Sequence, residues 1–183
     1  LSVWNRSADK ALALQAFGAT VANTPAQAVA QASVVITMLQ DGDAVSDVLF
    51  NQGAAHAMQA GSTVLDMSSI APAQAQAHAT QLQALNIHHV DAPVSGGTVG
   101  AEQGKLAIMA GGDSALFNEL APVFVAMGNA THVGPSGSGQ LAKLANQMIV
   151  GITIGAVAEA LLLAEKGGAN MAKVREAIGG GFA

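Results

Sequence analysis

The feature that most constrains the fold is an alternation of short β-branched runs with longer alanine-rich segments. The runs "VVITML" (34–39), "STVLDMS" (62–68) and "IHHVDAPV" (87–94) are typical of strands, and "APAQAQAHATQLQALN" (71–86) is typical of a helix. Continuous β-branched runs suit a sheet that is covered on both faces. Parallel strands need long crossovers, which the helical segments provide. The sequence therefore predicts an α/β fold with an open, doubly wound Rossmann-like sheet.

The same alternation extends in both directions along the chain. A short extended start precedes a helix expected from Ser7 to Gly18 and a second helix that Thr24 caps, with Pro25 at its first position. The remaining expected elements are strands at 105–112 and 131–134 in the same parallel style, a helix at 114–128, and a helix capped by Asp41 and Asp43 after residue 39.

The last part of the chain has a different character. One helical pattern begins near residue 140 and runs for about 28 residues, or ~42 Å at 1.5 Å per residue, and a short helix follows at 171–180. A helix of that length usually leaves the domain in which it begins. We therefore expect a Rossmann-like domain at 1–136, followed at 137–183 by an interdomain helix and the start of an all-α domain.

The opening of the chain lacks one expected motif. A dinucleotide fold begins with a strand, a G-x-G-x-x-G turn and a helix whose free N–H groups hold the pyrophosphate. No such turn follows the opening "LSVW". We therefore expect the first domain to lack its first βα unit and the chain to be a fragment of a longer protein.

Composition narrows the classes of function. With 183 residues, 51% of them hydrophobic and 10% charged, the chain can bury a substantial core. The net charge of −5 and the 7 scattered Lys and Arg residues argue against a nucleic-acid partner. The absence of cysteine excludes disulfides and thiol catalysis.

The sequence also bears on location and on metals. No segment has the pattern of a leader, and the apolar stretch 148–164 is interrupted by Thr153 and Glu159, so we expect a cytoplasmic protein with no membrane partner. His88 and His89 are adjacent and point to opposite faces of a strand, and the other histidines have no ligand spacing. No metal site is expected.

Two short motifs carry candidate chemistry. In "GQLAKLANQ", Lys143, Asn146 and Gln147 lie at i, i+3 and i+4, so one helical face presents an amine and two amides. A partly desolvated lysine exchanges a proton near neutral pH, but for this motif taken alone a structural lysine at the edge of an apolar helix is the more ordinary interpretation.

The second motif is "DAPVSGG", which places Ser95, Gly96 and Gly97 at the carboxyl end of a strand. Open α/β sheets bind their ligands at that edge. The two glycines allow a close backbone approach, and their N–H groups and the serine hydroxyl suit a carboxylate. A plain turn after a strand is the alternative interpretation.

Five segments together resemble one family. They occur in the order and spacing found in the β-hydroxyacid dehydrogenases, the group of 3-hydroxyisobutyrate dehydrogenase and tartronate semialdehyde reductase. The resemblance covers essentially the whole chain. Ser68-Ser69 and Asn146-Gln147 are most similar to the tartronate semialdehyde reductase branch. The segments are "VITML", "DMSSIAP", "DAPVSGG", "GSGQLAKLANQ" and "EALLLAEKGGANMAKVREAIGGGFA".

The resemblance implies roles for individual residues. Lys143 matches the catalytic lysine that exchanges a proton with the substrate oxygen. Ser95, Gly96 and Gly97 match the loop that binds the substrate carboxylate, and Asn146 or Gln147 would orient the substrate. The residues that match the cofactor site are Met38, Leu39 and Ser69 at the nicotinamide end and Asn5, Arg6 and Ser7 beside the adenosine ribose.

The function implied is hydride transfer between NAD(P)H and a small 3-oxo or 3-hydroxy acid. The reduction of tartronate semialdehyde to glycerate is the specific expectation. 3-Hydroxyisobutyrate dehydrogenase is one alternative, and a non-catalytic cofactor-binding module or inactive fragment is another. Arg6 can pair with a 2′-phosphate, which favours NADP over NAD, unless it stacks on the adenine. The family resemblance also implies a dimer or tetramer.

Overall fold

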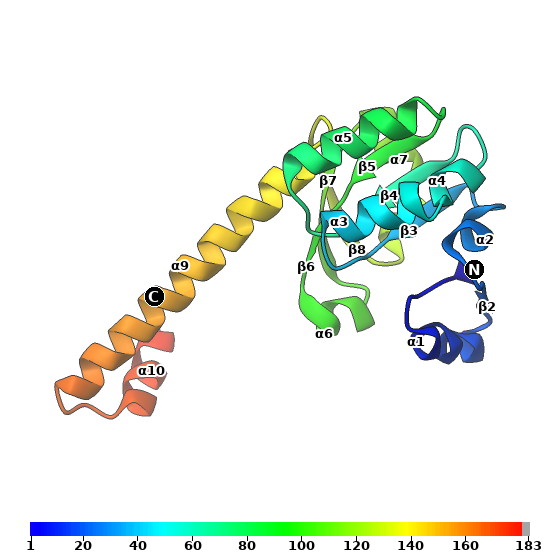
Figure 1. Cartoon of the computed structure of the whole chain (residues 1–183). Helices are drawn as coiled ribbons and strands as arrows, with labels where there is room; N and C mark the ends of the chain where they lie inside the picture. The colour runs from blue at the N-terminus through cyan, green and yellow to red at the C-terminus, as the bar shows by residue number, and fades with distance from the viewer. Residues whose placement is uncertain (181–183) are drawn as a thin grey trace. The chain divides into compact units, whose positions relative to one another are not determined.

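The structure is a computed structural model that describes residues 1–180, and the chain forms two compact units, Leu1–Lys143 and Leu144–Ala183. The first unit contains every strand of the described residues. Its main sheet has six strands (Figure 1). The strand order is β3 (Val34–Thr37), β4 (Thr63–Asp66), β5 (His88–Asp91), β7 (Leu106–Gly111) and β6 (Val94–Ser95), and β8 (Gly128–Gly134) also pairs with β7.

The direction of the strands agrees with the prediction in only one half of the sheet. β3, β4 and β5 are parallel, with Thr37 opposite Asp66 and Asp66 opposite Asp91. β7 is antiparallel to β5 and to β6, and β8 is parallel to β7. The expectation of a parallel sheet throughout was therefore wrong. Between β5 and β7 the chain forms only β6 and the six-residue helix α6 (Gly97–Glu102), too short for a crossover.

Two predicted elements are each divided near a proline. The strand expected at 87–94 is interrupted before Pro93, whose nitrogen has no hydrogen to donate to a neighbouring strand. The helix expected at 114–128 becomes two short helices, and Pro122 lies in the first turn of the second. These helices are α7 (Ser114–Glu119) and α8 (Ala121–Val125).

The N-terminal segment forms a separate two-stranded parallel sheet. The helix expected to start after Ser7 does so, although it tightens into a 3₁₀ turn before ending at Gly18, which is left-handed at φ 82°. Thr24 caps the next helix as predicted, accepting a hydrogen bond from the Gln27 N–H at 3.2 Å. The elements are β1 (Ser2–Val3), α1 (Ala8–Leu12), η1 (Ala13–Phe17), β2 (Thr20–Val21) and α2 (Pro25–Val29).

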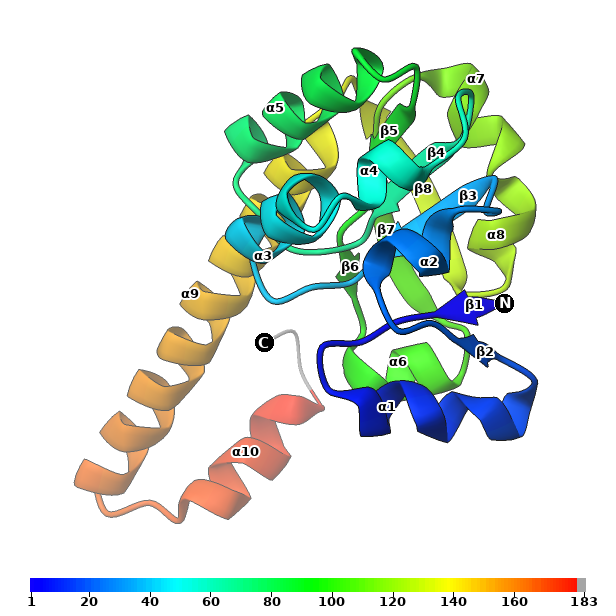
Figure 2. The ribbon, with the colours of Figure 1, turned by 45° about the vertical axis from the view of Figure 1, so that its right-hand side comes forward.

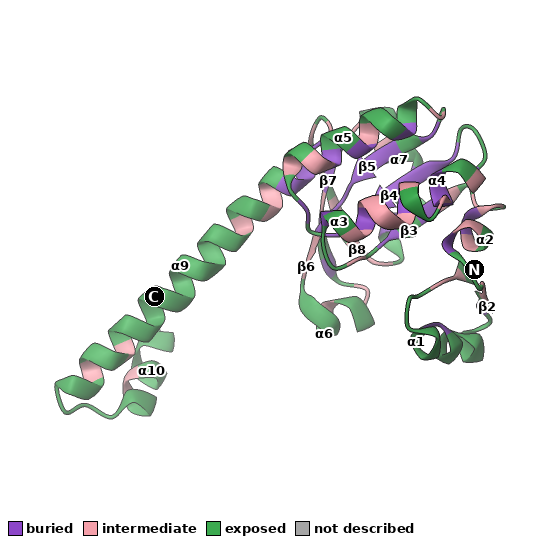
Figure 3. Cartoon of the chain, in the orientation of Figure 1, coloured by how far each residue is buried: buried purple, intermediate pink, exposed green. Residues whose placement is uncertain are grey.

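The main sheet is covered on both faces, as its apolar strands require. Adjacent residues of β4 enter different cores because side chains alternate along a strand: Val64 packs in one cluster and Leu65 in the other. The central strands are the most buried part of the unit (Figure 3). Phe124 of α8 belongs to the second cluster. The helices with side chains in the first cluster are α2, α3 (Gly42–Ser46), η2 (Asp47–Asn51), α4 (Ala54–Ala57) and α5 (Pro72–Gln83). Figure 2 labels α2, α3, α4 and α5 in the ribbon.

The long helix is present as predicted. α9 (Ser138–Lys166) has 29 residues; it begins in the first unit and continues into the second. In the second unit it exposes large apolar side chains, among them Ile152 and Leu163. By length and composition alone α9 is able to cross a membrane, with a mean hydropathy of 1.9 over 18 residues. A helix that lies in the core of a helical domain has the same composition.

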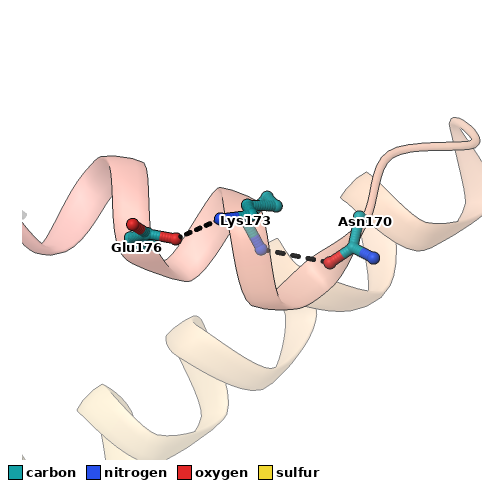
Figure 4. A network of polar contacts seen from close by, with 3 residues as sticks. All are labelled: Asn170, Lys173 and Glu176. Atoms are coloured by element: carbon teal, nitrogen blue, oxygen red, sulfur yellow. Dashed lines mark hydrogen bonds and ion pairs between the residues drawn. The ribbon is translucent and has the colours of Figure 1, made fainter.

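The second unit ends, within the described residues, with α10 (Met171–Gly179). Asn170 caps this helix by accepting a hydrogen bond from the Lys173 N–H at 3.1 Å, and Lys173 Nζ pairs with Glu176 at 2.8 Å (Figure 4). Both charged side chains are largely exposed, so this ion pair contributes little to stability.

Candidate active site

An open pocket of about 470 Å³ lies in the first unit. It brings together residues that the sequence analysis selected from three separate segments: Met38 after β3, Lys143 in the first turns of α9, and the loop after β6. Their convergence favours a shared ligand site. The pocket residues used below are Met38, Ser95, Gly96, Gly97, Thr98 and Lys143.

Lys143 is half-buried in this pocket. Its Nζ donates a hydrogen bond to the main-chain oxygen of Val94 at 2.8 Å. No carboxylate among residues 1–180 forms a salt bridge with it, since the one pair found there joins Lys173 and Glu176. An ammonium group has three donors, so two remain for a substrate after the bond to Val94. This geometry leaves the amine facing the pocket with donors for a ligand, and its catalytic role stays a prediction.

The glycine loop lines the same pocket. Gly96 and Gly97 have φ angles of 133° and 61°, which favour glycine. Gly97 begins α6, a helix that the sequence analysis missed. A turn and a pocket wall are therefore the same structure here, and the two interpretations of "SGG" do not exclude each other. The free N–H groups of this first helical turn are available to a ligand.

Residues predicted at the cofactor site follow the carboxyl ends of neighbouring parallel strands. Met38 and Leu39 follow β3, and Ser69 follows β4. The Leu39 N–H donates to Ser68 Oγ at 2.9 Å, which links the two loops. The side chain of Met38 is 55% exposed and Ser69 is also exposed. Parallel strands bind ligands at this edge, so the placement suits a cofactor.

The remaining predicted residues lie elsewhere. Asn5, Arg6 and Ser7 are exposed and form the turn after β1, where the Ser7 N–H donates to Asn5 Oδ1 at 2.8 Å. Asn146 and Gln147 belong to the second unit, and their role in substrate binding stays a prediction.

Sequence analysis missed two buried carboxylates at the same sheet edge. Asp91 ends β5 and accepts hydrogen bonds from the N–H groups of Gly137 at 2.7 Å and Gln140 at 3.0 Å. Burial raises the pKa of Asp91 to about 6, although these donors oppose the shift. Asp66 ends β4, accepts from Thr37 Oγ1 at 2.7 Å, and has its pKa raised by burial. The available signal was an acidic residue at the end of an otherwise apolar strand.

A buried glutamine was missed as well. Gln140, in the first turn of α9, is 1% exposed. Its Nε2 donates to the oxygen of Ser68 at 2.8 Å, and its Oε1 accepts from the Ile70 N–H at 3.0 Å. Both ends of the amide are therefore paired with the loop that contains Ser69.

Gly139 permits the start of α9 to approach the sheet. A Cβ there would overlap the main-chain oxygens of Asp91 and Met109. We expect Gly139→Ala to lower the free energy of unfolding by about 1–3 kcal/mol, because the backbone must shift. Gly151→Ala, in the same helix with no atom near the new Cβ, is the control and is expected to raise stability by up to ~1 kcal/mol. Urea unfolding measures both, and equal stabilities would contradict the close approach.

Comparison with known proteins agrees with this geometry. A family model described as the NAD binding domain of 6-phosphogluconate dehydrogenase matches residues 1–135. A second, described as the NAD-binding part of NADP-dependent 3-hydroxyisobutyrate dehydrogenase, matches residues 137–183. The chain belongs to the 3-hydroxyisobutyrate dehydrogenase-like family of β-hydroxyacid dehydrogenases. The predicted family and Rossmann-like fold are confirmed, and the cofactor of this domain is NAD or NADP.

Individual relatives give the extent of the match. The chain is 44% identical over 178 residues to 2-hydroxy-3-oxopropionate reductase of Escherichia coli K12, covering 96% of this chain and 60% of the relative. It is 39% identical to a probable mitochondrial 3-hydroxyisobutyrate dehydrogenase-like protein of Arabidopsis thaliana, covering 100% and 55%. The structure of Mycobacterium tuberculosis 3-hydroxyisobutyrate dehydrogenase with L-serine superimposes with a TM-score of 0.90 at 33% identity, covering 97% and 61%. The chain thus spans about three fifths of the length of these relatives.

Proposed function

We propose that the protein containing this chain transfers hydride between NAD(P)H and a small 3-oxo or 3-hydroxy acid. The observation that carries the proposal is the pocket in which the Lys143 amine shares walls with Met38 and the Ser95–Gly97 loop. Membership of the family supports the class of reaction. The pocket supports the roles proposed for Lys143 and the Ser95–Gly97 loop.

The residues at the sheet edge fit the cofactor. Met38 offers an exposed apolar side chain at the carboxyl end of β3, beside the pocket, and suits the nicotinamide end. Leu39 and Ser69, which follow the neighbouring strands β3 and β4, would also contact the nicotinamide part of the cofactor. Asn5–Ser7 would contact the adenosine ribose. When bound, NAD(P)H supplies the hydride. The chain's own residues orient the partners and move the proton.

The substrate would bind through its carboxylate and its carbonyl oxygen. The Ser95 hydroxyl and the N–H groups of Gly96 and Gly97 suit the carboxylate. The protonated Lys143 amine would give one proton to the carbonyl oxygen as the carbonyl carbon receives hydride, so that C=O becomes CH–OH. In the reverse direction the amine would take the hydroxyl proton. Asn146 or Gln147, which the family resemblance assigns to orienting the substrate, belongs to the second unit, and this role stays a prediction.

For the substrate we favour tartronate semialdehyde, reduced to glycerate. The identity of 44% to a 2-hydroxy-3-oxopropionate reductase supports it. The alternative is a 3-hydroxyisobutyrate dehydrogenase, supported by the structural match to the Mycobacterium tuberculosis protein. NADPH oxidation by the purified protein, with tartronate semialdehyde and with methylmalonate semialdehyde, separates the two. Cofactor binding without turnover on any 3-oxo acid would instead indicate a non-catalytic binding module.

Arg6 provides a test of cofactor preference. If it pairs with the 2′-phosphate of NADPH, Arg6→Gln is expected to raise the KM for NADPH about 10-fold and leave the KM for NADH unchanged. Lys10→Gln removes another exposed positive charge of the same segment and is the control. Equal weakening of both cofactors by Arg6→Gln would show that Arg6 stacks on the adenine instead.

We also infer a homo-oligomer, a dimer or tetramer, located in the cytoplasm. The exposed apolar side chains of α9, such as Ile152 and Leu163, support assembly through the helical part, because contiguous apolar surface marks an interface. Light scattering on the purified protein measures the mass, and a monomer at micromolar concentration would contradict the assembly.

A further inference from the structure

The start of α9 is held by a buried polar chain that crosses three strand ends. Thr37 Oγ1, at the end of β3, donates to Asp66 Oδ1 at 2.7 Å. Asp66 Oδ1 also accepts from the Ser68 N–H at 3.0 Å. The Ser68 oxygen accepts from Gln140 Nε2 at 2.8 Å, and the Gln140 N–H donates to Asp91 Oδ2 at 3.0 Å. The chain of contacts therefore joins β3, β4, α9 and β5.

Gln140 is the link through which this chain reaches the helix. It is the one described residue of α9 whose side chain binds the 68–70 loop, and it does so with both ends of its amide. Its main chain is at the same time fixed by Asp91, whose other oxygen accepts from Gly137. A side chain with one donor end and one acceptor end, 1% exposed and fully paired, permits a single register of the helix against the loop.

That register determines where the reactive amine lies. Lys143 is three residues after Gln140, on the next turn of the same helix and still within the first unit. The Gln140 side chain binds the main chain of Ser68 and of Ile70. Ser69, which is predicted to lie at the nicotinamide end of the cofactor, is the residue between them. The Gln140 amide thus links the helix that contains Lys143 to the loop that contains Ser69.

We infer that Gln140 is a positioning residue that sets the Lys143 amine relative to the cofactor loop at Ser69. The expected effect of Gln140 on turnover rests on the proposed function. The expected effect of Gln140 on the position of the Lys143 amine does not. Gln140 does not line the pocket, and it acts through Lys143. Asp91 holds the main chain of the same turn, and Ser68 presents the oxygen that Gln140 binds.

The first experiment needs no catalytic activity. Acetylation of each lysine is followed by mass spectrometry in the wild-type protein and in Gln140→Met, which keeps the length of the side chain but loses both hydrogen bonds. The Lys143 amine is half-buried and bonded to Val94, so loosening the turn is expected to raise its acetylation rate about fivefold. The exposed Lys10 and Lys105 are internal references whose rates should not change.

A matched control uses the same substitution nearby. Gln76 Nε2 also donates to a main-chain oxygen, that of Ser136, just before α9, but Gln76 is exposed and bonds no cofactor loop. Gln76→Met is expected to leave the Lys143 rate unchanged. A Lys143 rate that is equal in Gln140→Met and wild type overturns the inference. So does a rise by the same factor at Lys10 and Lys105, which would show that the change is not specific to Lys143.

The second experiment is a double-mutant cycle on turnover. Gln140→Met is expected to lower kcat about 10-fold with little change in the KM for NADPH, whereas in a Lys143→Ala background the same change should lower kcat less than ~2-fold. A full 10-fold loss in both backgrounds would show that Gln140 does not act through Lys143. If the wild-type protein turns over no 3-oxo acid, the proposed function fails, and the acetylation rates alone decide the inference.

Discussion

Replacing Lys143 by alanine is expected to lower kcat by at least ~10², the usual contribution of general acid catalysis. The pocket offers no other titratable side chain near the Ser95–Gly97 loop, since Lys143 is the one ionisable residue lining it within the described part of the chain. The amine also has two donors free after its bond to Val94. Steady-state kinetics with NADPH and a 3-oxo acid measure the loss. Turnover like that of the wild type would show that the proton comes from another group.

Lys143→Arg separates proton transfer from charge. A guanidinium keeps the positive charge but does not release a proton at neutral pH. If Lys143 acts by proton transfer, the arginine variant should be nearly as slow as the alanine variant. If the residue only attracts the substrate carboxylate, arginine should restore most of the activity. Lys105→Ala, which changes an exposed lysine, is the control for the loss of one charge.

The second large effect concerns stability in acid. His89 is buried in β5, and neither ring nitrogen has a hydrogen-bond partner among the described residues. Burial lowers the pKa of His89 to about 4, with a smaller contribution from His78. Between the unfolded pKa of 6.5 and a folded pKa near 4, only the unfolded state binds this proton. The contribution of neutral His89 to the free energy of unfolding is therefore fully present above about pH 6.5. This contribution falls by about 3 kcal/mol as the pH is lowered to 4.

A leucine at this position should remove that loss. We compare the free energy of unfolding of His89→Leu with that of the wild type at each pH. The difference, variant minus wild type, is expected to be about 3 kcal/mol larger at pH 4 than at pH 7, because leucine has no proton to bind. His88→Leu is the matched control, since His88 is the neighbouring but exposed residue of the same strand. Denaturant unfolding at the two pH values gives the difference. An equal pH dependence in both variants would mean that His89 accepts its proton in the folded protein.

Local patterns predicted most of the elements, and the family resemblance predicted which residues share one pocket. Thr24 and Asp41 cap helices as expected, and α9 extends within two residues of its predicted bounds, because capping and helical periodicity are properties of neighbouring residues. Family resemblance, rather than spacing, assigned Lys143 and Ser95 to one site. The pocket that contains both agrees with that assignment.

The direction of β7 and the buried polar chain were not predictable in the same way. A strand's pattern of side chains is the same whether its neighbour is parallel or antiparallel, so "KLAIMAGG" carried no signal of its direction. Asp66, Asp91 and Gln140 were not selected because an isolated acid or amide in a sequence does not reveal its burial or its partners.

The amino-acid sequence alone thus indicated an α/β dinucleotide fold and a long helix, since these depend on periodicity and caps along the chain, and its resemblance to a known family predicted a catalytic role for Lys143. The placement of that lysine depends on contacts between residues 46 to 72 positions apart, such as Gln140 with Ser68 and Gly137 with Asp91. Such contacts form only when the strand ends are brought to one edge of the sheet. The candidate reactive groups can therefore be recognised in short sequence motifs, whereas their relative positions depend on tertiary packing.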